Sequence, residues 1–136
     1  MTPILVFDIE TIPDVAGLRR VHPEAAGLDD EAVIVCFEPG AIAAVRAARP
    51  GLRTIQHVWS VPIAAAAALG CWAVGFDDLH ATPRALRTAQ RLGLATTVYT
   101  VNDEPRLLEL AGLGVTGVFT DLPRQARAWL GRRAAG

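Results

Sequence analysis

The sequence predicts an α/β fold in which parallel strands alternate with helices, in a sheet or a barrel. Short apolar runs recur along the chain, and each is followed by a stretch with helical spacing. The runs are continuous rather than alternating, which is typical of strands buried on both faces of a parallel sheet. We therefore expect about six parallel strands joined by right-handed crossovers.

Six segments fit this description of a strand. The first, Ile4–Ile9, ends in carboxylates, and the fifth, Thr96–Val101, is rich in β-branched residues, which favour strands. The predicted strands are residues 4–9, 33–37, 54–59, 71–76, 96–101 and 115–120.

Helix signals separate these strands. Pro39 and Pro83 suit the first position of a helix, and Thr82 suits the capping position before it. Asp103 and Asp121 precede the last two helices, and capping is the simplest role for both. The predicted helices are 14–21, 39–49 (ended by Pro50-Gly51), 62–69 (ended by Gly70), 83–92 (ended by Gly93), 104–111 (ended by Gly112) and one that reaches Trp129.

Composition excludes several classes of protein. The chain has 136 residues, 51% of them hydrophobic, and a net charge of −1, which suits one globular domain and excludes a disordered chain. All 13 basic residues are arginine, so chemistry that needs a lysine is excluded. The longest apolar run is shorter than the roughly 20 residues that span a bilayer, and no secretory signal opens the chain. We expect a cytoplasmic protein in which Cys36 and Cys71 are small buried hydrophobes.

Charge is distributed unevenly along the chain. Residues 1–32 carry seven acidic side chains and two arginines, whereas residues 33–136 carry seven acidic side chains and eleven arginines. A change of sign at one point can mark a boundary between unlike segments. We therefore divide the chain into 1–32 and 33–136.

Polar side chains gather where the predicted strands end. Ligands of parallel α/β folds bind at the carboxyl ends of the strands, and carboxylates there suit a divalent cation. His57 is the imidazole among these residues and a candidate proton carrier, although a simple polar position at the rim explains it as well. The residues at the predicted strand ends are Asp8, Glu10, Glu38, His57, Asp77, Asp78, Asn102, Asp103 and Asp121.

Asp8 and Glu10 are two residues apart on a strand and so share one face, an arrangement that binds hard cations. The segment PILVFDIETIPDVAGLRRVH, residues 3–22, resembles the start of a DEDD-type 3′–5′ exonuclease related to the exonuclease domain of family B DNA polymerases. In that family the Asp and Glu of D-x-E-T, here Asp8 and Glu10, are metal ligands. Asp77 and the pair Tyr99 and Asp103 imitate its later motifs, but the chain between them is shorter than that family requires.

Residues 33–130 resemble the carboxyl-terminal part of the glycerophosphodiester phosphodiesterases. The segment VIVCFEP resembles a family strand that ends in S-F-D/E. The segment YTVND resembles the family's W-T-V-N, and GVTGVFTDLP resembles its G-V-D-G-I-I-T-D-x-P. The resemblance implies a partial TIM (β/α)8-type barrel that binds Ca²⁺ or Mg²⁺ and hydrolyses glycerophosphodiesters in lipid metabolism. It also implies that Tyr99, in place of the family tryptophan, and Asn102 contact the substrate.

The family's H-R-G histidine and E-x-D metal pair have no counterpart in this sequence. Glu10 stands in chain order near the remaining family metal ligand, so both resemblances assign it to a metal, with Asp8 beside it. We expect a small phosphodiester substrate and a truncated, catalytically incomplete hydrolase in which His57 is the candidate catalytic group. The alternatives are an exonuclease acting on DNA and a non-catalytic barrel fragment that self-associates through open sheet edges.

Overall fold

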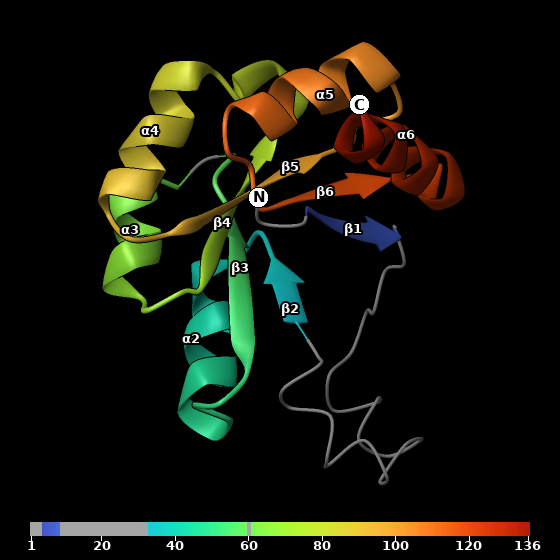
Figure 1. Cartoon of the computed structure of the whole chain (residues 1–136). Helices are drawn as coiled ribbons and strands as arrows, with labels where there is room; N and C mark the ends of the chain where they lie inside the picture. The colour runs from blue at the N-terminus through green and yellow to red at the C-terminus, as the bar shows by residue number, and fades with distance from the viewer. Residues whose placement is uncertain (1–3, 9–32, 60) are drawn as a thin grey trace, which may run out of the picture.

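A curved, six-stranded parallel sheet is the framework of the protein (Figure 1). The computed structural model describes residues 4–8, 33–59 and 61–136. The strands are β1 (Leu5–Asp8), β2 (Val33–Cys36), β3 (Arg53–His57), β4 (Ala73–Asp77), β5 (Ala95–Tyr99) and β6 (Gly117–Thr120). The helices are α2 (Pro39–Ala48), α3 (Ile63–Ala68), the 3₁₀-helix η2 (Asp78–His80), α4 (Pro83–Arg91), α5 (Glu104–Gly112) and α6 (Pro123–Ala135).

The strand order distinguishes a barrel wall from an open doubly wound sheet. It is β1-β6-β5-β4-β3-β2, with every neighbouring pair parallel. The first strand thus lies beside the last, as in a (β/α)8 barrel, whereas in a doubly wound sheet it lies in the interior. This confirms the predicted α/β fold of alternating strand–helix units, a curled part of a TIM-type barrel.

The two faces of the sheet are filled by side chains of different kinds. Alternate strand residues, such as Val74, Phe76 and Val98, face the helices and join one apolar core with them. The intervening positions face the inside of the curve, and most of those ahead of the carboxyl ends carry small side chains. The inward residues there are Ile55, Ala73, Gly75, Thr97 and Gly117.

Local signals set most of the helix boundaries. Thr82 and Asp103 cap α4 and α5, accepting hydrogen bonds from the backbone N–H groups of Ala85 and Arg106. We predicted that Gly112 would stop the helix after residue 111, but α5 includes Gly112 as its last residue. The glycine in the left-handed conformation that follows the helix is Gly114, with φ +79°.

The last helix differs from the prediction at both ends. Leu122 occupies its capping position, and the Asp121 carboxylate instead accepts a hydrogen bond from Asn102. The helix also continues past Trp129 to Ala135, since the alanines and arginines that follow favour helix. The predicted helix at 14–21 lies outside the described residues. In the described ranges, no helix has the length and apolar character needed to cross a membrane.

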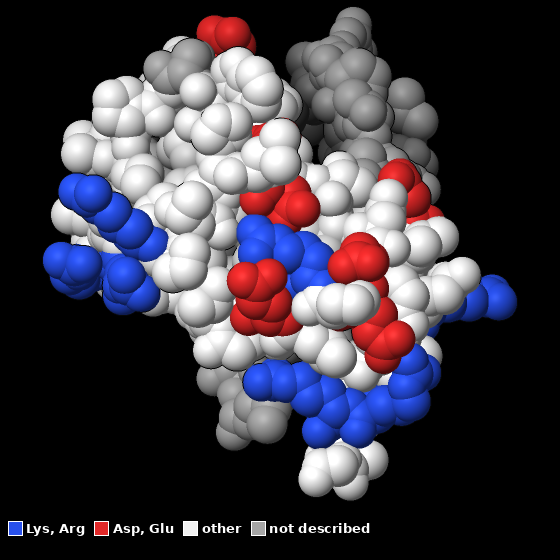
Figure 2. All heavy atoms as spheres, turned by 90° about the horizontal axis from the view of Figure 1, so that it is seen from above, with Lys and Arg blue, Asp and Glu red and all other residues white. Residues whose placement is uncertain are grey.

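Arg106 attaches the short helix η2 to α5. Its Nε donates to the Asp78 carboxylate at 2.8 Å, and its Nη2 donates to the backbone oxygens of Asp78 and Ala81 at 3.0 and 3.2 Å. A further ion pair at 2.9 Å joins Arg106 to Glu109. Figure 2 shows acidic and basic groups alternating across this face of the molecule. A planar guanidinium can make these bonds together, whereas an ammonium group cannot.

We expect Arg106→Met to lower the free energy of unfolding by about 2 kcal/mol, because charge-assisted bonds to η2 are lost from a side chain that is only 22% exposed. Chemical denaturation of the purified variant measures this. The matched control is Arg132→Met, which removes a 2.7 Å pair with Glu104 from a side chain that is 61% exposed. An exposed pair contributes little, so the control should stay within about 1 kcal/mol of wild type. Equal losses in the two variants would contradict the role of Arg106.

Candidate functional site

Four rings meet where the strands end on the inside of the sheet. His57 is the last residue of β3, Tyr99 is the last residue of β5, Phe119 lies in β6, and Phe37 directly follows β2. The imidazole centroid of His57 lies 4.2 Å from the ring of Tyr99, 4.6 Å from Phe37 and 5.8 Å from Phe119. We call these four side chains the aromatic layer. It covers the small residues in the middle of the sheet with a largely apolar surface.

Gly75 makes room for the imidazole at the centre of this layer. It is the register partner of His57 on the neighbouring strand, and an ideal Cβ at Gly75 would lie 2.1 Å from His57 Nδ1. No side chain can be accommodated at that distance without displacing the ring. A glycine inside an apolar strand often marks such a close approach, so this was the sequence signal that could have located the layer.

Burial keeps the His57 imidazole neutral. It lowers the pKa of His57 from 6.5 to about 4. Burial also raises the pKa of the Tyr99 hydroxyl, with a further contribution from the Asp77 carboxylate. His57 Nδ1 and the Tyr99 hydroxyl are buried without a hydrogen-bond partner in the described part of the chain. The layer therefore presents uncharged polar atoms among aromatic rings, and His57 is a poor base at neutral pH.

Asn102 joins the loops that follow β5 and β6. Its Oδ1 accepts from Thr120 Oγ1 and from the Asp121 backbone N–H, each at 2.9 Å, and its Nδ2 donates to the Asp121 carboxylate at 2.8 Å. The segment TVN after Tyr99 and the segment TDLP after Phe119 are thus held together at the carboxyl edge. This gives Asn102 a structural function at the position where we predicted a substrate contact.

The described carboxylates at the strand ends are engaged separately. Asp77 accepts from the Leu79 backbone N–H, Asp103 caps α5, and Asp121 pairs with Asn102. Among the described residues, no three His, Cys, Asp or Glu side chains come together as metal ligands. These described carboxylates therefore do not converge on one three-ligand site. Asp8 ends β1 opposite Thr120, which puts it at the carboxyl edge, and Glu10 lies outside the described residues.

Phe37 and Phe119 were not predicted as residues of the site. Both stand at the end of apolar runs, where the sequence alone does not distinguish a ring facing the helices from one facing inward. Of the two cysteines, Cys71 is buried as expected, and Cys36 is half-buried, with its Sγ accepting from the Glu38 backbone N–H.

Gly75→Ala should lower the free energy of unfolding by about 1–3 kcal/mol, because its methyl group would overlap the His57 ring. Urea denaturation of a double-mutant cycle tests the cause: in a His57→Ala background the same substitution should cost much less. Gly51→Ala, where nothing lies within 4 Å of the new Cβ, is the matched control. An equal cost of Gly75→Ala with and without the imidazole would refute the contact.

The stability of the protein should fall as pH is lowered from about 6.5 to 4 in a manner that depends on His57. In this range the unfolded chain binds the imidazole proton and the folded chain does not, so acid favours unfolding. The expected contribution is about 3 kcal/mol, fully present above pH 6.5. Urea denaturation of wild type and His57→Phe at several pH values measures it. The free energy of unfolding should fall more steeply with decreasing pH in wild type than in His57→Phe. Parallel curves for the two proteins would contradict the lowered pKa of His57.

Comparisons with known proteins agree with this architecture. The family model described as "Glycerophosphoryl diester phosphodiesterase family" matches residues 14–125, which begin within the segment 1–32. The comparison with curated proteins finds no match.

Several solved structures share the fold. A glycerophosphodiester phosphodiesterase from Parabacteroides distasonis is 21% identical with TM-score 0.74, over 96% of this chain and 58% of its own. A phosphodiesterase from Oleispira antarctica in complex with the product sn-glycerol-3-phosphate is 20% identical with TM-score 0.74, over 85% and 48%. A glycerophosphodiester phosphodiesterase from Agrobacterium tumefaciens is 16% identical with TM-score 0.64, over 90% and 53%.

The chain spans about half the length of these structures. The family match covers most of the chain, and it includes the aromatic layer and the two segments that Asn102 joins. This chain belongs to the glycerophosphoryl diester phosphodiesterase family.

Proposed function

We propose that this chain forms the carboxyl-terminal wall of a metal-dependent phosphodiesterase site that acts on small glycerophosphodiesters in lipid metabolism. The observation that carries the proposal is the network in which Asn102 joins TVN to TDLP at the carboxyl edge of a barrel-type sheet. These segments resemble two family signatures, and both lie within the matched residues 14–125. The carboxyl edge is also where barrel enzymes bind their substrates.

Tyr99 contributes to the wall of the substrate site in this proposal. The residue is half-buried, yet its hydroxyl is buried. We therefore expect the ring rather than the hydroxyl to contact the carbon skeleton of the substrate, as an aromatic wall does. Asn102 holds the two loops together through Oδ1 and one Nδ2 proton, and its second Nδ2 proton remains available for the predicted contact with the substrate.

Metal binding is assigned to Glu10, with Asp8 beside it, and the cation is Ca²⁺ or Mg²⁺. The family resemblance supports this assignment, as does the position of Asp8 at the carboxyl end of β1. Carboxylate oxygens are the ligands that these cations prefer. A bound cation would polarise the phosphoryl oxygen of the substrate.

Proton transfer is the weak part of the site. His57 is neutral and enclosed by rings, so it is poorly suited to act as a general base or acid near neutral pH. The sequence also contains neither H-R-G nor E-x-D. We propose that the 136-residue chain alone is catalytically incomplete.

Release of sn-glycerol 3-phosphate from glycerophosphocholine, with Ca²⁺ or Mg²⁺ present, tests the activity. We expect turnover about 10²–10⁴-fold below that of a relative that keeps the H-R-G histidine, which is the contribution of general acid–base catalysis. Thermal unfolding with and without Ca²⁺ tests the metal separately: Glu10→Gln should abolish stabilisation by Ca²⁺, and Glu24→Gln should retain it.

The two measurements can fail independently. Robust turnover that is lost in Glu10→Gln would refute the incomplete site while supporting the metal ligand. Equal Ca²⁺ stabilisation of wild type and Glu10→Gln would refute the ligand. Metal-dependent degradation of single-stranded DNA that is lost in Asp8→Ala would favour the exonuclease alternative over this proposal.

A further inference from the structure

Three arginines cover the outward face of α4. Arg84, Arg87 and Arg91 are all exposed, whereas Leu86 and Ala89, on the opposite side of the helix, are buried in the core. With about 3.6 residues per turn, the three arginines lie within about 60° of one another around the helix axis. They extend over about 10 Å along that axis. We call these three side chains the basic row.

The basic row lies apart from acidic side chains in the described part of the chain. Residues 79–102 contain no Asp or Glu. In α5, the next helix along the chain, Glu104 pairs with Arg132 at 2.7 Å. Glu109 of the same helix pairs with Arg106 at 2.9 Å. Among the described residues, the basic row therefore forms no ion pair. In Figure 2 arginines gather at the left, the side on which Figure 1 draws α4, with no acidic group beside them.

This local charge differs from that of the protein as a whole. The net charge of the chain is −1, so the molecule overall does not attract anions. At physiological salt, charges act over a Debye length of about 8 Å, so a nearby anionic surface responds mainly to the charges closest to it. Such a surface would therefore bind the protein in one orientation, with α4 towards it.

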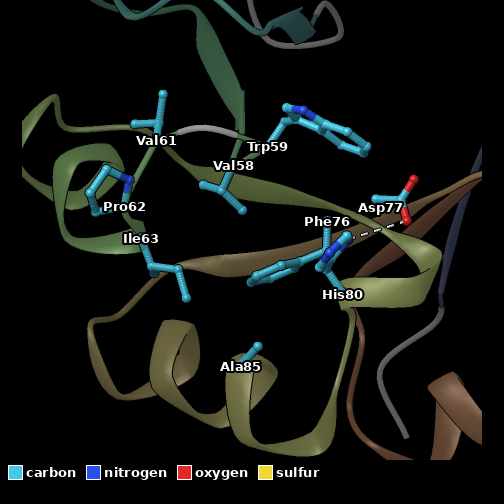
Figure 3. A pocket seen from close by; sticks show the side chains of 9 residues that line it. All are labelled: Val58, Trp59, Val61, Pro62, Ile63, Phe76, Asp77, His80 and Ala85. Atoms are coloured by element: carbon cyan, nitrogen blue, oxygen red, sulfur yellow. Dashed lines mark ion pairs between the residues drawn. The ribbon is translucent and has the colours of Figure 1, made fainter.

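Exposed apolar side chains lie just ahead of α4. Leu79, in η2, is 87% exposed, and it precedes the first residue of α4 by four positions. The next residue, His80, meets the indole of Trp59 edge-on, with 5.8 Å between the ring centroids (Figure 3). Trp59 is itself 66% exposed. An exposed leucine and an exposed indole next to a row of arginines are typical of protein surfaces that lie in the interface of a membrane.

We propose that α4 and η2 dock this protein on the surface of a bilayer that contains anionic phospholipids. The basic row binds the lipid phosphates, and Leu79 and Trp59 enter the boundary between headgroups and acyl chains. A nucleic acid also offers phosphates to arginine, but it has no apolar layer into which Leu79 could insert. The inference goes beyond the proposed hydrolysis and does not require it, because binding is measured without turnover.

Co-sedimentation of the full 136-residue chain with phosphatidylcholine vesicles, with and without about one third phosphatidylserine, tests the proposal. We expect binding to the anionic vesicles that is at least about tenfold tighter than to the neutral ones. Raising the ionic strength from about 0.1 M to about 0.5 M should weaken it, because salt screens the basic row. Equal binding to the two kinds of vesicle, or no binding to either, would overturn the proposal.

Paired substitutions test whether α4 is the contact. Arg84→Gln/Arg91→Gln should weaken binding to the anionic vesicles about 10- to 30-fold, since each arginine near a charged membrane contributes about fivefold. The matched control is Arg124→Gln/Arg127→Gln, which removes the same charge from exposed positions of α6. Glutamine supports helices, so both variants should fold, and the control should bind within about twofold of wild type. Equal losses in the two variants would refute the site on α4.

Leu79→Ser tests the apolar contact. It should weaken binding to the anionic vesicles about three- to tenfold, because an inserted side chain is lost, and it should fold, because Leu79 is 87% exposed. Leu79→Trp should strengthen binding, since tryptophan favours the membrane interface. Undiminished binding in Leu79→Ser, or binding of the wild-type chain to a DNA duplex but not to vesicles, would refute docking on a bilayer.

Discussion

Curvature of the parallel sheet is the constraint on which the rest of this structure depends. A curved sheet has an outer face with ample room and an inner face with little. The outer face is covered by helices that bury Val74, Phe76 and Val98, whereas small residues such as Ala73 and Gly117 lie on the inner face ahead of the carboxyl ends. Larger rings fit on the inside only at the carboxyl ends. The aromatic layer is therefore a result of the curvature as much as of the residues that form it.

The polar groups at the carboxyl edge of the sheet have different roles. His57 is buried among rings and neutral, and Asn102, Asp103 and Asp121 hold loops and helix ends in place. A strand end rich in polar residues is therefore not by itself an active site. The carboxylates of Asp77, Asp103 and Asp121 have structural partners among the described residues, and the metal proposal relies instead on the family resemblance of Asp8 and Glu10.

Asp77 lies next to the aromatic layer and also next to the short helix η2. Its negative charge adds to burial in raising the pKa of Tyr99, and its side chain also lines a pocket beside η2 (Figure 3). Arg106 fixes the η2 turn that follows Asp77 by binding Asp78 and Ala81. The proposed substrate wall thus borders one short turn, which the guanidinium holds against α5.

The sequence by itself determined the fold class, because apolar runs and helix caps such as Thr82 and Asp103 are local signals. It also contained the family signatures, including TVN and TDLP. The junction proposed near residue 32 remains a prediction. Only the tertiary structure decided which face each ring occupies, that Gly75 makes space for His57, and that Asn102 joins two loops. The physical reason is that these relations arise between neighbouring strands whose residues are about twenty positions apart in the sequence, and no local pattern records which of them meet.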